Sequence, residues 1–192
     1  FEEGRHTLEL IMNAGEVVKS PGLREDLPLV VAIREKGIPV ISEIEFAGRY
    51  TDAFKVCVTG SNGKTTTTNL IYHMMKKAGL NVAMTGNVGN SFAMAVAEGG
   101  YDYYVIELSS FQLDGMYDFK AEIAILMNIT PDHLDRYDHE MQNYVDSKMR
   151  VIRNQAAADC FIWCADDPVT AREVAARTLT SRSLPFSIDR SE

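Results

Sequence analysis

The chain has 192 residues, of which 46% are hydrophobic, and its 27 acidic and 19 basic residues give a formal net charge of −8. That size suffices for a sizeable core, and without any lysine- and arginine-rich block the chain is not expected to bind nucleic acid. No apolar run reaches the roughly 20 residues that a membrane span needs, so we expect no membrane insertion and a cytoplasmic location.

The first part of the chain reads as a small α/β unit. A strand is expected at residues 16–19, followed by the turn Ser20-Pro21-Gly22, a helix near residues 27–36 and a strand at residues 39–42. So few strands hardly form a stable core by themselves. We therefore predict that residues 1–42 are the C-terminal part of a domain that begins outside this chain.

The remainder alternates short β-branched runs with longer segments of helical periodicity, which is typical of parallel strands joined by crossover helices. Strands are expected at residues 55–59, 81–85, 103–108, 123–128, 160–164 and 184–188, and helices at 63–78, 89–97, 141–154 and 168–177. We therefore predict an open, mostly parallel α/β sheet in residues 43–192, with the C-terminal end of that domain incomplete.

Three cysteines, Cys57, Cys160 and Cys164, fall in the predicted strands, and we expect them to be buried free thiols. The spacing of the last two could suggest a metal pair. No further cysteine or histidine stands nearby, so this interpretation is set aside.

A candidate phosphate-binding loop follows the strand at residues 55–59 and leads directly into a helix. Its residues are Gly60, Ser61, Asn62, Gly63, Lys64, Thr65 and Thr66. Glycines let backbone amides approach an anion, the helix N-terminus favours negative charge, and lysine and threonine can reach phosphates and Mg²⁺. Val58 stands where the strict motif has its first glycine, so a helix start with a solvated lysine is the alternative.

Two further polar positions follow predicted strands. Glu107 ends the apolar strand at 103–108, where a carboxylate can hold Mg²⁺. Asp132 and His133 follow the strand at 123–128, and both side chains are plausible ligands or proton carriers. The alternatives are a solvent-facing acid and an exposed loop histidine.

Lys148 lies within an apolar stripe on the predicted helix at 141–154. The stripe comprises Met141, Tyr144, Val145, Val151 and Ile152. A charge on a buried face needs a partner, unless the side chain reaches the rim of the helix. Alternatively, Lys148 faces the nucleotide site as an ammonium or as a carbamate, which forms only from the free amine.

Four polar residues each follow a different predicted parallel strand: Lys64, Asn87, Glu107 and His133. Ligands of open α/β sheets bind beyond the carboxyl ends of the strands. We therefore expect these four residues to lie along one edge of the sheet.

The strings VTGSNGKTTTT, GNVG, ELSSFQL and NITPDHLDRY, with the later Lys148, resemble the central ATPase domain of the Mur ligases, which uses a shortened phosphate loop. ELSSFQL together with NITPDHLDRY is most similar to the members that add D-glutamate. VVKSPGL and PVISEIEFAGRY resemble the end of the UDP-binding domain of the family and the junction after it.

The resemblance implies specific roles for residues of this chain. Lys64 would contact the phosphates of ATP, Thr65 and Glu107 would hold one Mg²⁺, and His133 and a carbamylated Lys148 would hold a second. Lys64, Lys148 and His133 are thus the expected catalytic residues. Asn87 would lie near both ATP and the substrate carboxylate, and Ser20 and Gly22 would touch the UDP moiety.

The implied activity is ATP-dependent amide-bond formation, which joins D-glutamate to UDP-N-acetylmuramoyl-L-alanine through an acyl phosphate in peptidoglycan precursor synthesis. We expect a monomer, and we expect the chain on its own to be inactive because the family's D-glutamate site lies mainly in a C-terminal domain. The alternatives are a folylpolyglutamate synthase, a nucleotide-binding switch without ligase activity, and a purely structural α/β domain.

Overall fold

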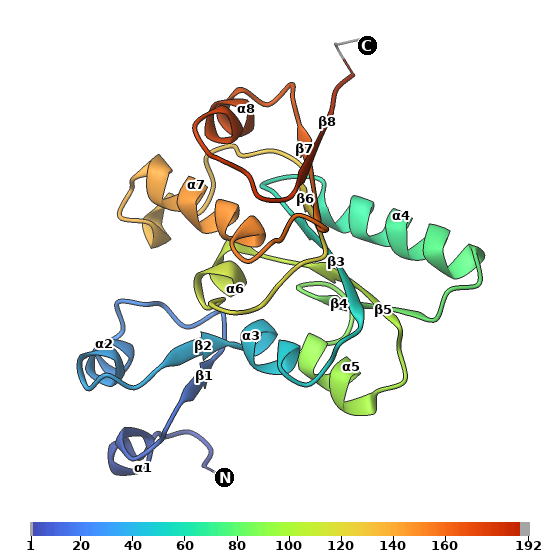
Figure 1. Ribbon diagram of the computed structural model, residues 1–192. Helices are drawn as coiled ribbons and strands as arrows, with labels where there is room; N and C mark the ends of the chain where they lie inside the picture. Colours follow the sequence, from blue (N-terminus) through green and yellow to red (C-terminus); the bar gives the residue numbers. More distant parts are fainter. Residues whose placement is uncertain (1, 189–192) are drawn as a thin grey trace.

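The computed structural model describes residues 2–188, which form two parallel sheets (Figure 1). The small sheet consists of β1 (Val17–Lys19) and β2 (Val40–Ser42). The large sheet has six strands: β3 (Phe54–Thr59), β4 (Val82–Gly86), β5 (Tyr103–Glu107), β6 (Ile123–Leu126), β7 (Cys160–Cys164) and β8 (Arg182–Phe186). The predicted open parallel α/β architecture is confirmed.

The helices connect these strands in the order that a parallel sheet requires. They are α1 (Leu8–Met12), α2 (Pro28–Glu35), α3 (Glu43–Gly48), α4 (Lys64–Lys77), α5 (Phe92–Glu98), α6 (Ser110–Asp114), α7 (Met141–Met149) and α8 (Pro168–Ala175). Two 3-10 helices, η1 (Leu134–Arg136) and η2 (Arg150–Ile152), lie before and after α7.

The order of strands in the large sheet is β4-β5-β3-β6-β7-β8. Strands β4 and β5 lie on one side of β3, and β6 to β8 lie on the other, so the direction of winding reverses at the centre of the sheet. In open α/β sheets, ligands bind at such a reversal, beyond the carboxyl ends of the strands. The loops after β3, β4, β5 and β6 meet at this edge.

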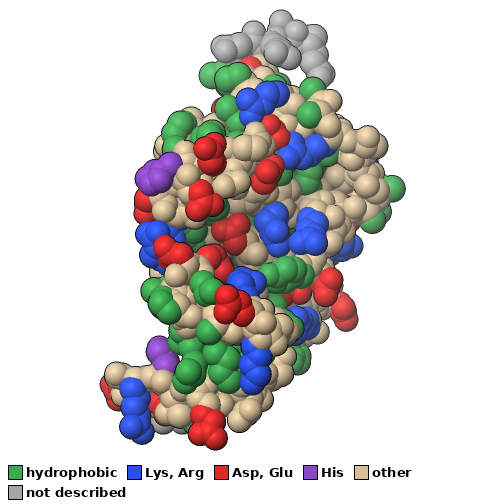
Figure 2. Space-filling model, turned by 90° about the vertical axis from the view of Figure 1, so that its left-hand side faces the viewer, with side chains coloured by type: hydrophobic (Ala, Val, Ile, Leu, Met, Phe, Trp, Pro, Cys, Tyr) green, Lys and Arg blue, Asp and Glu red, His purple; other side chains and the backbone are tan. Residues whose placement is uncertain are grey.

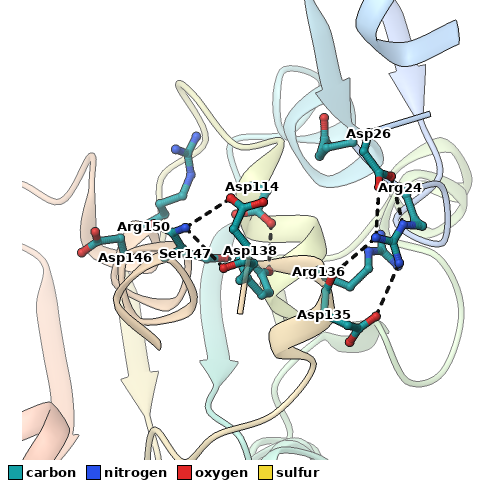
Figure 3. Close-up of a pocket in the computed structure, with 12 residues that line it drawn as sticks. Arg24, Asp26, Asp114, Asp135, Arg136, Asp138, Asp146, Ser147 and Arg150 are labelled. Carbon is teal, nitrogen blue, oxygen red and sulfur yellow. Dashed lines mark hydrogen bonds and ion pairs between the residues drawn. The ribbon is translucent and has the colours of Figure 1, made fainter. Parts of the chain in front are cut away.

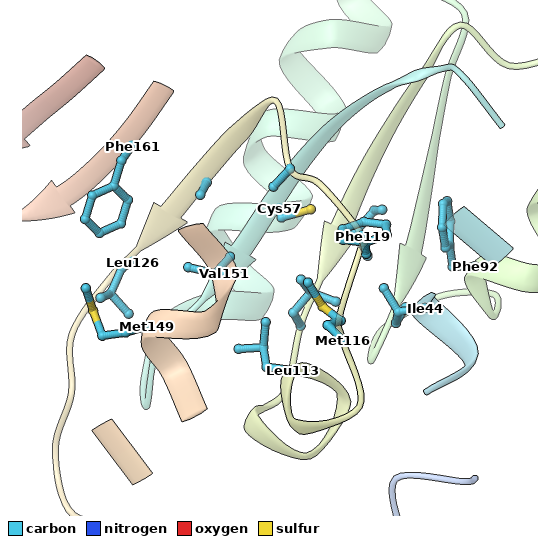
Figure 4. Packing of buried hydrophobic residues seen from close by; sticks show 14 of the residues in the cluster. Ile44, Cys57, Phe92, Leu113, Met116, Phe119, Leu126, Met149, Val151 and Phe161 are labelled. Atoms are coloured by element: carbon cyan, nitrogen blue, oxygen red, sulfur yellow. The ribbon is translucent and has the colours of Figure 1, made fainter. Parts of the chain in front are cut away.

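Two hydrophobic layers cover the large sheet. Helix α4 covers one face through a small cluster that includes Val56, Val58 and Ile125. The other face carries the main core, in which α3, α5, α6 and α7 contribute (Figure 4). Its fully buried members include Cys57, Ile106 and Leu126.

The structure corrects the limits of several predicted elements. Strand β8 begins two residues earlier than predicted, at Arg182, and Ile188 is 93% exposed. Strand β6 ends at Leu126, because the side chain of Asn128 turns to accept a hydrogen bond from the backbone of Asn62. Helix α5 begins at Phe92 rather than at residue 89, because the side chain of Ser91 accepts a hydrogen bond from the backbone of Met94 and caps the helix there. The predicted helix at 141–154 tightens into η2 after Met149.

The thiol prediction is correct for only one cysteine. Cys57 is fully buried, and burial raises the pKa of its thiol. Cys160 and Cys164 are only partly buried, because β7 lies next to the edge strand β8 and not at the centre of the sheet. All three are free thiols.

Acidic and basic side chains are interspersed over the face of the molecule that Figure 2 shows. Among residues 2–188, no helix is both long and apolar enough to cross a membrane.

We expect Gly86 to be essential for the fold at the edge that carries the candidate site. Its φ is +102°, and a Cβ atom there would collide with the carbonyl oxygen of Glu107. Gly86→Ala should lower the free energy of unfolding by about 3 kcal/mol or more. Gly79→Ala is the matched control, because Gly79 also has a positive φ but open space around it, and should cost about 1 kcal/mol. Urea unfolding of both variants measures the difference, and equal losses would contradict the steric argument.

Candidate functional site

The candidate site begins with the loop between β3 and α4. Gly60 has a φ of +144°, and a Cβ atom there would press on Met127 and on the backbone of Asn128. Gly63, with a φ of 83°, forms the N-terminal cap of α4. Glycine is required at both positions for different reasons: close approach of two chain segments at Gly60, and a left-handed backbone at Gly63. The first amides of α4 therefore face the edge of the sheet without acceptors in their own helix.

Lys64 folds back over this loop. Its ammonium donates hydrogen bonds to the carbonyl oxygens of Gly60 and Ser61, both at 2.9 Å. The side chain is thereby held at the mouth of the loop, next to the first amides of α4. This arrangement of cation and amides suits an anion such as a phosphate.

Glu107 contacts two other predicted site residues, Thr65 and Asn87. The carboxylate is 1% exposed, and it accepts hydrogen bonds from the hydroxyl of Thr65 at 2.7 Å and from the side-chain amide of Asn87 at 2.9 Å. Glu107 thus does not face solvent as an ordinary strand-end acid. Both hydrogen-bond partners are neutral, so the buried negative charge is available to a cation.

Lys148 is 2% exposed and reaches across to the phosphate-binding loop from α7. Its ammonium donates to the carbonyl oxygen of Gly60 at 2.8 Å, the same oxygen that accepts from Lys64. Burial, and then the charge of Lys64, lower the pKa of Lys148 to about 7. The side chain therefore does not extend to the rim of the helix.

His133 comes from the loop after β6, and its side chain is 55% exposed. Its ring is 5.3 Å from the ring of Phe111, and its Nε2 is 3.5 Å from a carboxylate oxygen of Asp132. The backbone of His133 is left-handed, with a φ of 51°. This conformation turns the loop after β6 toward the cavity.

A cavity of about 140 Å³ lies among these residues. It is lined by Lys64, Asn87, Ser109, Ser110, Phe111, Asp132, His133, Tyr144 and Lys148. The predicted meeting of residues from four strands at one edge is therefore observed. Phe111 and Tyr144 also line the cavity without a predicted role, although Tyr144 stands one helical turn before Lys148 in the same apolar stripe.

Some predicted residues have other contacts. The hydroxyl of Ser61 is turned inward, 3.0 Å from the hydroxyl of Tyr144, and donates to the carbonyl oxygen of Thr130 at 2.8 Å. Asn62 and Thr66 are exposed at the start of α4. The hydroxyl of Ser61 therefore stabilises the loop and does not face the cavity.

Ser20 and Gly22 do not line this cavity. They lie on the turn after β1, beside a separate cavity of about 520 Å³ between residues 24–26 and α7 (Figure 3). This larger cavity is lined mainly by aspartate and arginine side chains. Neither the phosphate-binding loop nor a buried lysine is among its lining residues. The chemistry therefore identifies the smaller cavity as the candidate active site.

Within residues 2–188, no three side chains of His, Cys, Asp or Glu are arranged as a metal site. The metal sets expected from the resemblance include a threonine and a carbamylated lysine, which are not among those four residue types. Buried Glu107 and the hydroxyl of Thr65, which donates to it, supply the oxygen donors that Mg²⁺ prefers.

Comparisons with known proteins give a consistent result. Residues 58–191 match the Mur ligase middle domain family. The chain is 62% identical over 192 residues to the UDP-N-acetylmuramoylalanine--D-glutamate ligase of Bacteroides fragilis; the match spans the whole chain but only 43% of that protein. The chain thus spans less than half the length of this relative.

Solved structures share the fold at low sequence identity. A UDP-N-acetylmuramate:L-alanyl-gamma-D-glutamyl-meso-diaminopimelate ligase from Neisseria meningitides matches with a TM-score of 0.64 at 17% identity, over 90% of this chain and 58% of that one. MurF ligase from Thermotoga maritima in complex with ADP matches with a TM-score of 0.60 at 18% identity, over 94% of this chain and 52% of that one.

Proposed function

Because the chain belongs to the Mur ligase family, we propose that it is the nucleotide-binding part of an enzyme that adds D-glutamate to UDP-N-acetylmuramoyl-L-alanine at the expense of ATP. Residues 43–192 would form most of the central ATP-binding domain, although residues 189–192 lie outside the described part. Residues 1–42 would be the end of the domain that binds the UDP substrate.

The observation that carries this proposal is the pair of lysines at one carbonyl oxygen. Lys64 and Lys148 come from different helices and both donate to the oxygen of Gly60, beside the buried carboxylate of Glu107. Lys64, at the start of a helix, can bind the phosphates of ATP, and the buried amine of Lys148 lies beside it at the same loop. A structural domain has no need for a lysine that is 2% exposed at this position.

The proposed first step is attack of the alanyl carboxylate of the UDP substrate on the γ-phosphorus of ATP, which yields an acyl phosphate and ADP. Both reactants are anions, so their approach is opposed by charge repulsion. Lys64 would offset this repulsion at the phosphates, and Asn87 would orient the carboxylate from its position next to Glu107. In the second step the amine of D-glutamate displaces the phosphate.

We propose that Thr65 and Glu107 hold one Mg²⁺ and that His133 and Lys148, as its carbamate, hold another. Bound Mg²⁺ would add positive charge where ATP and the substrate carboxylate meet. A carbamate forms when the neutral amine of Lys148 attacks CO₂ and releases a proton. The lowered pKa of Lys148, about 7, supports this step, because a large fraction of the amine is then neutral at neutral pH.

Ser20 and Gly22 are proposed to contact the UDP moiety, although they lie outside the small cavity. We also propose that the full-length enzyme is a monomer and is located in the cytoplasm. The oligomeric state can be tested by sedimentation of the purified full-length protein.

The proposal predicts that ADP release by the full-length protein requires both substrates. We expect little ADP without UDP-N-acetylmuramoyl-L-alanine, and formation of the amide only when D-glutamate is added. The measurement is coupled ADP detection together with chromatography of the product. Folate substrates serve as the control for a folylpolyglutamate synthase, and ATP hydrolysis that ignores both substrates would instead support a nucleotide-binding switch.

A further inference from the structure

Arg136 connects the turn after β1 with the wall of the candidate active site. We propose that Arg136 is a positioning residue: it fixes residues 20–23, here called the substrate loop, relative to His133, so that the UDP substrate enters the site in the correct orientation. This inference rests on the proposed function, because it assumes that the substrate loop contacts the UDP substrate.

Arg136 contacts both the substrate loop and the aromatic side chain of Phe111. Its Nη2 donates hydrogen bonds to the carbonyl oxygens of Pro21 and Leu23, each at 3.3 Å. Its Cζ lies 4.3 Å from the centre of the Phe111 ring, and that ring is 5.3 Å from the ring of His133. A single half-buried side chain therefore joins the substrate loop to the aromatic wall of the small cavity.

The substrate loop itself is held by two cations on one side. The ammonium of Lys19, which is 9% exposed as a residue, donates to the carbonyl oxygen of Leu23 at 2.7 Å. The amide of Leu23 donates to the carbonyl oxygen of Ser20 at 3.1 Å and closes the turn. Because every peptide bond described is trans, the amides of Gly22 and Arg24 point away from these cations. Arg136 thus determines which way the loop presents its amides.

A second bridge between the same two segments is weaker. Arg24 pairs with Asp26 at 2.9 Å and with Asp135 at 3.5 Å, beside Arg136 (Figure 3). Its side chain is 44% exposed, and exposed ion pairs stabilise a structure little. Arg136 is the more important of the two, since it combines two hydrogen bonds to the substrate loop with a contact to the face of the Phe111 ring.

The chemistry of these contacts requires arginine. A planar guanidinium can lie flat on the ring of Phe111 while its edge donates to two carbonyl oxygens. A lysine at this position retains the charge but cannot make all three contacts at once. The substitutions Arg136→Met and Arg136→Lys therefore separate the geometry from the charge.

The test is steady-state kinetics of the full-length protein with both variants. Arg136→Met should raise the KM for UDP-N-acetylmuramoyl-L-alanine about tenfold or more, and Arg136→Lys should lie in between. The KM for ATP should stay within about twofold, because among residues 2–188 Arg136 contacts the substrate loop and Phe111 but not the phosphate-binding loop. Arg153→Met is the matched control: Arg153 is exposed, 5.9 Å from the ring of Tyr117, and should leave both constants unchanged.

Three outcomes would overturn the inference. The KM for the UDP substrate could be unchanged in Arg136→Met, the KM for ATP could rise by the same factor, or Arg136→Lys could have the wild-type KM for the UDP substrate. The proposed function fails separately, if the wild-type protein makes no amide from D-glutamate. If Arg136→Met does not fold, two other variants test the inference: Arg136→Lys, and Phe111→Leu, which removes the ring beneath the guanidinium. In both, the KM for the UDP substrate should rise more than the KM for ATP.

Discussion

Replacing Lys148 by alanine is expected to lower the rate of amide formation by the full-length protein on the order of 10³-fold. The side chain is buried and ends at the carbonyl oxygen of Gly60, so the substitution removes an amine from inside the candidate site. ADP release with both substrates measures the loss. Lys120→Ala, which removes a lysine that is 41% exposed at the surface, is the control and should remain active.

Added short-chain carboxylic acids distinguish the two possible forms of Lys148. If the carbamate is the active form, a small carboxylate can enter the space that alanine leaves and partly restore the rate. If Lys148 acts as an ammonium, carboxylic acids will not help, and a small amine will be the better rescuing agent. A variant that keeps the wild-type rate without any additive would contradict both forms.

Lys64→Met is expected to reduce kcat by about 10²- to 10³-fold, because the ammonium at the mouth of the phosphate-binding loop is lost. The substitution has a second effect. The charge of Lys64 helps to lower the pKa of Lys148, so its removal raises that pKa, and the residual activity should need a higher pH. The pH–rate profile measures both effects. Lys77→Met, at the exposed end of α4, is the control, and a wild-type rate in Lys64→Met would refute the phosphate role.

The sequence was sufficient to predict the strands of the large sheet because their signals are local. The apolar run at residues 160–164 has the same limits in the structure, and the central strands differ by one or two residues. Three short helices, α1, α3 and α6, were missed. Helices α3 and α6 have six and five residues, which is too short for a periodic pattern. Their starts are fixed by side-chain caps, from Ser42 and from the pair Ser109 and Gln112.

Long-range contacts explain what the sequence could not predict. Glu45 in α3 is 1% exposed because its carboxylate accepts hydrogen bonds from the backbone of residues 117–119, more than 70 positions away. No local pattern predicts such a partner.

The same holds at the candidate site. Strand order predicts that Lys64, Asn87, Glu107 and His133 meet at one edge, and the structure brings them together. That two lysines share the oxygen of Gly60 depends on the packing of α7 and is visible only in three dimensions.

Buried Lys148 also places activity and stability in conflict. Its pKa is about 7 in the folded chain and 10.5 in an ordinary lysine, so between these pH values the unfolded chain binds a proton that the folded chain does not. Stability should therefore increase with pH across this interval, and the buried ammonium opposes folding most strongly below pH 7. An apolar residue such as methionine would remove this penalty and make the domain more resistant to acid. Selection for stability alone would favour the apolar residue, so a lysine at this position is expected only where the proposed catalysis requires it.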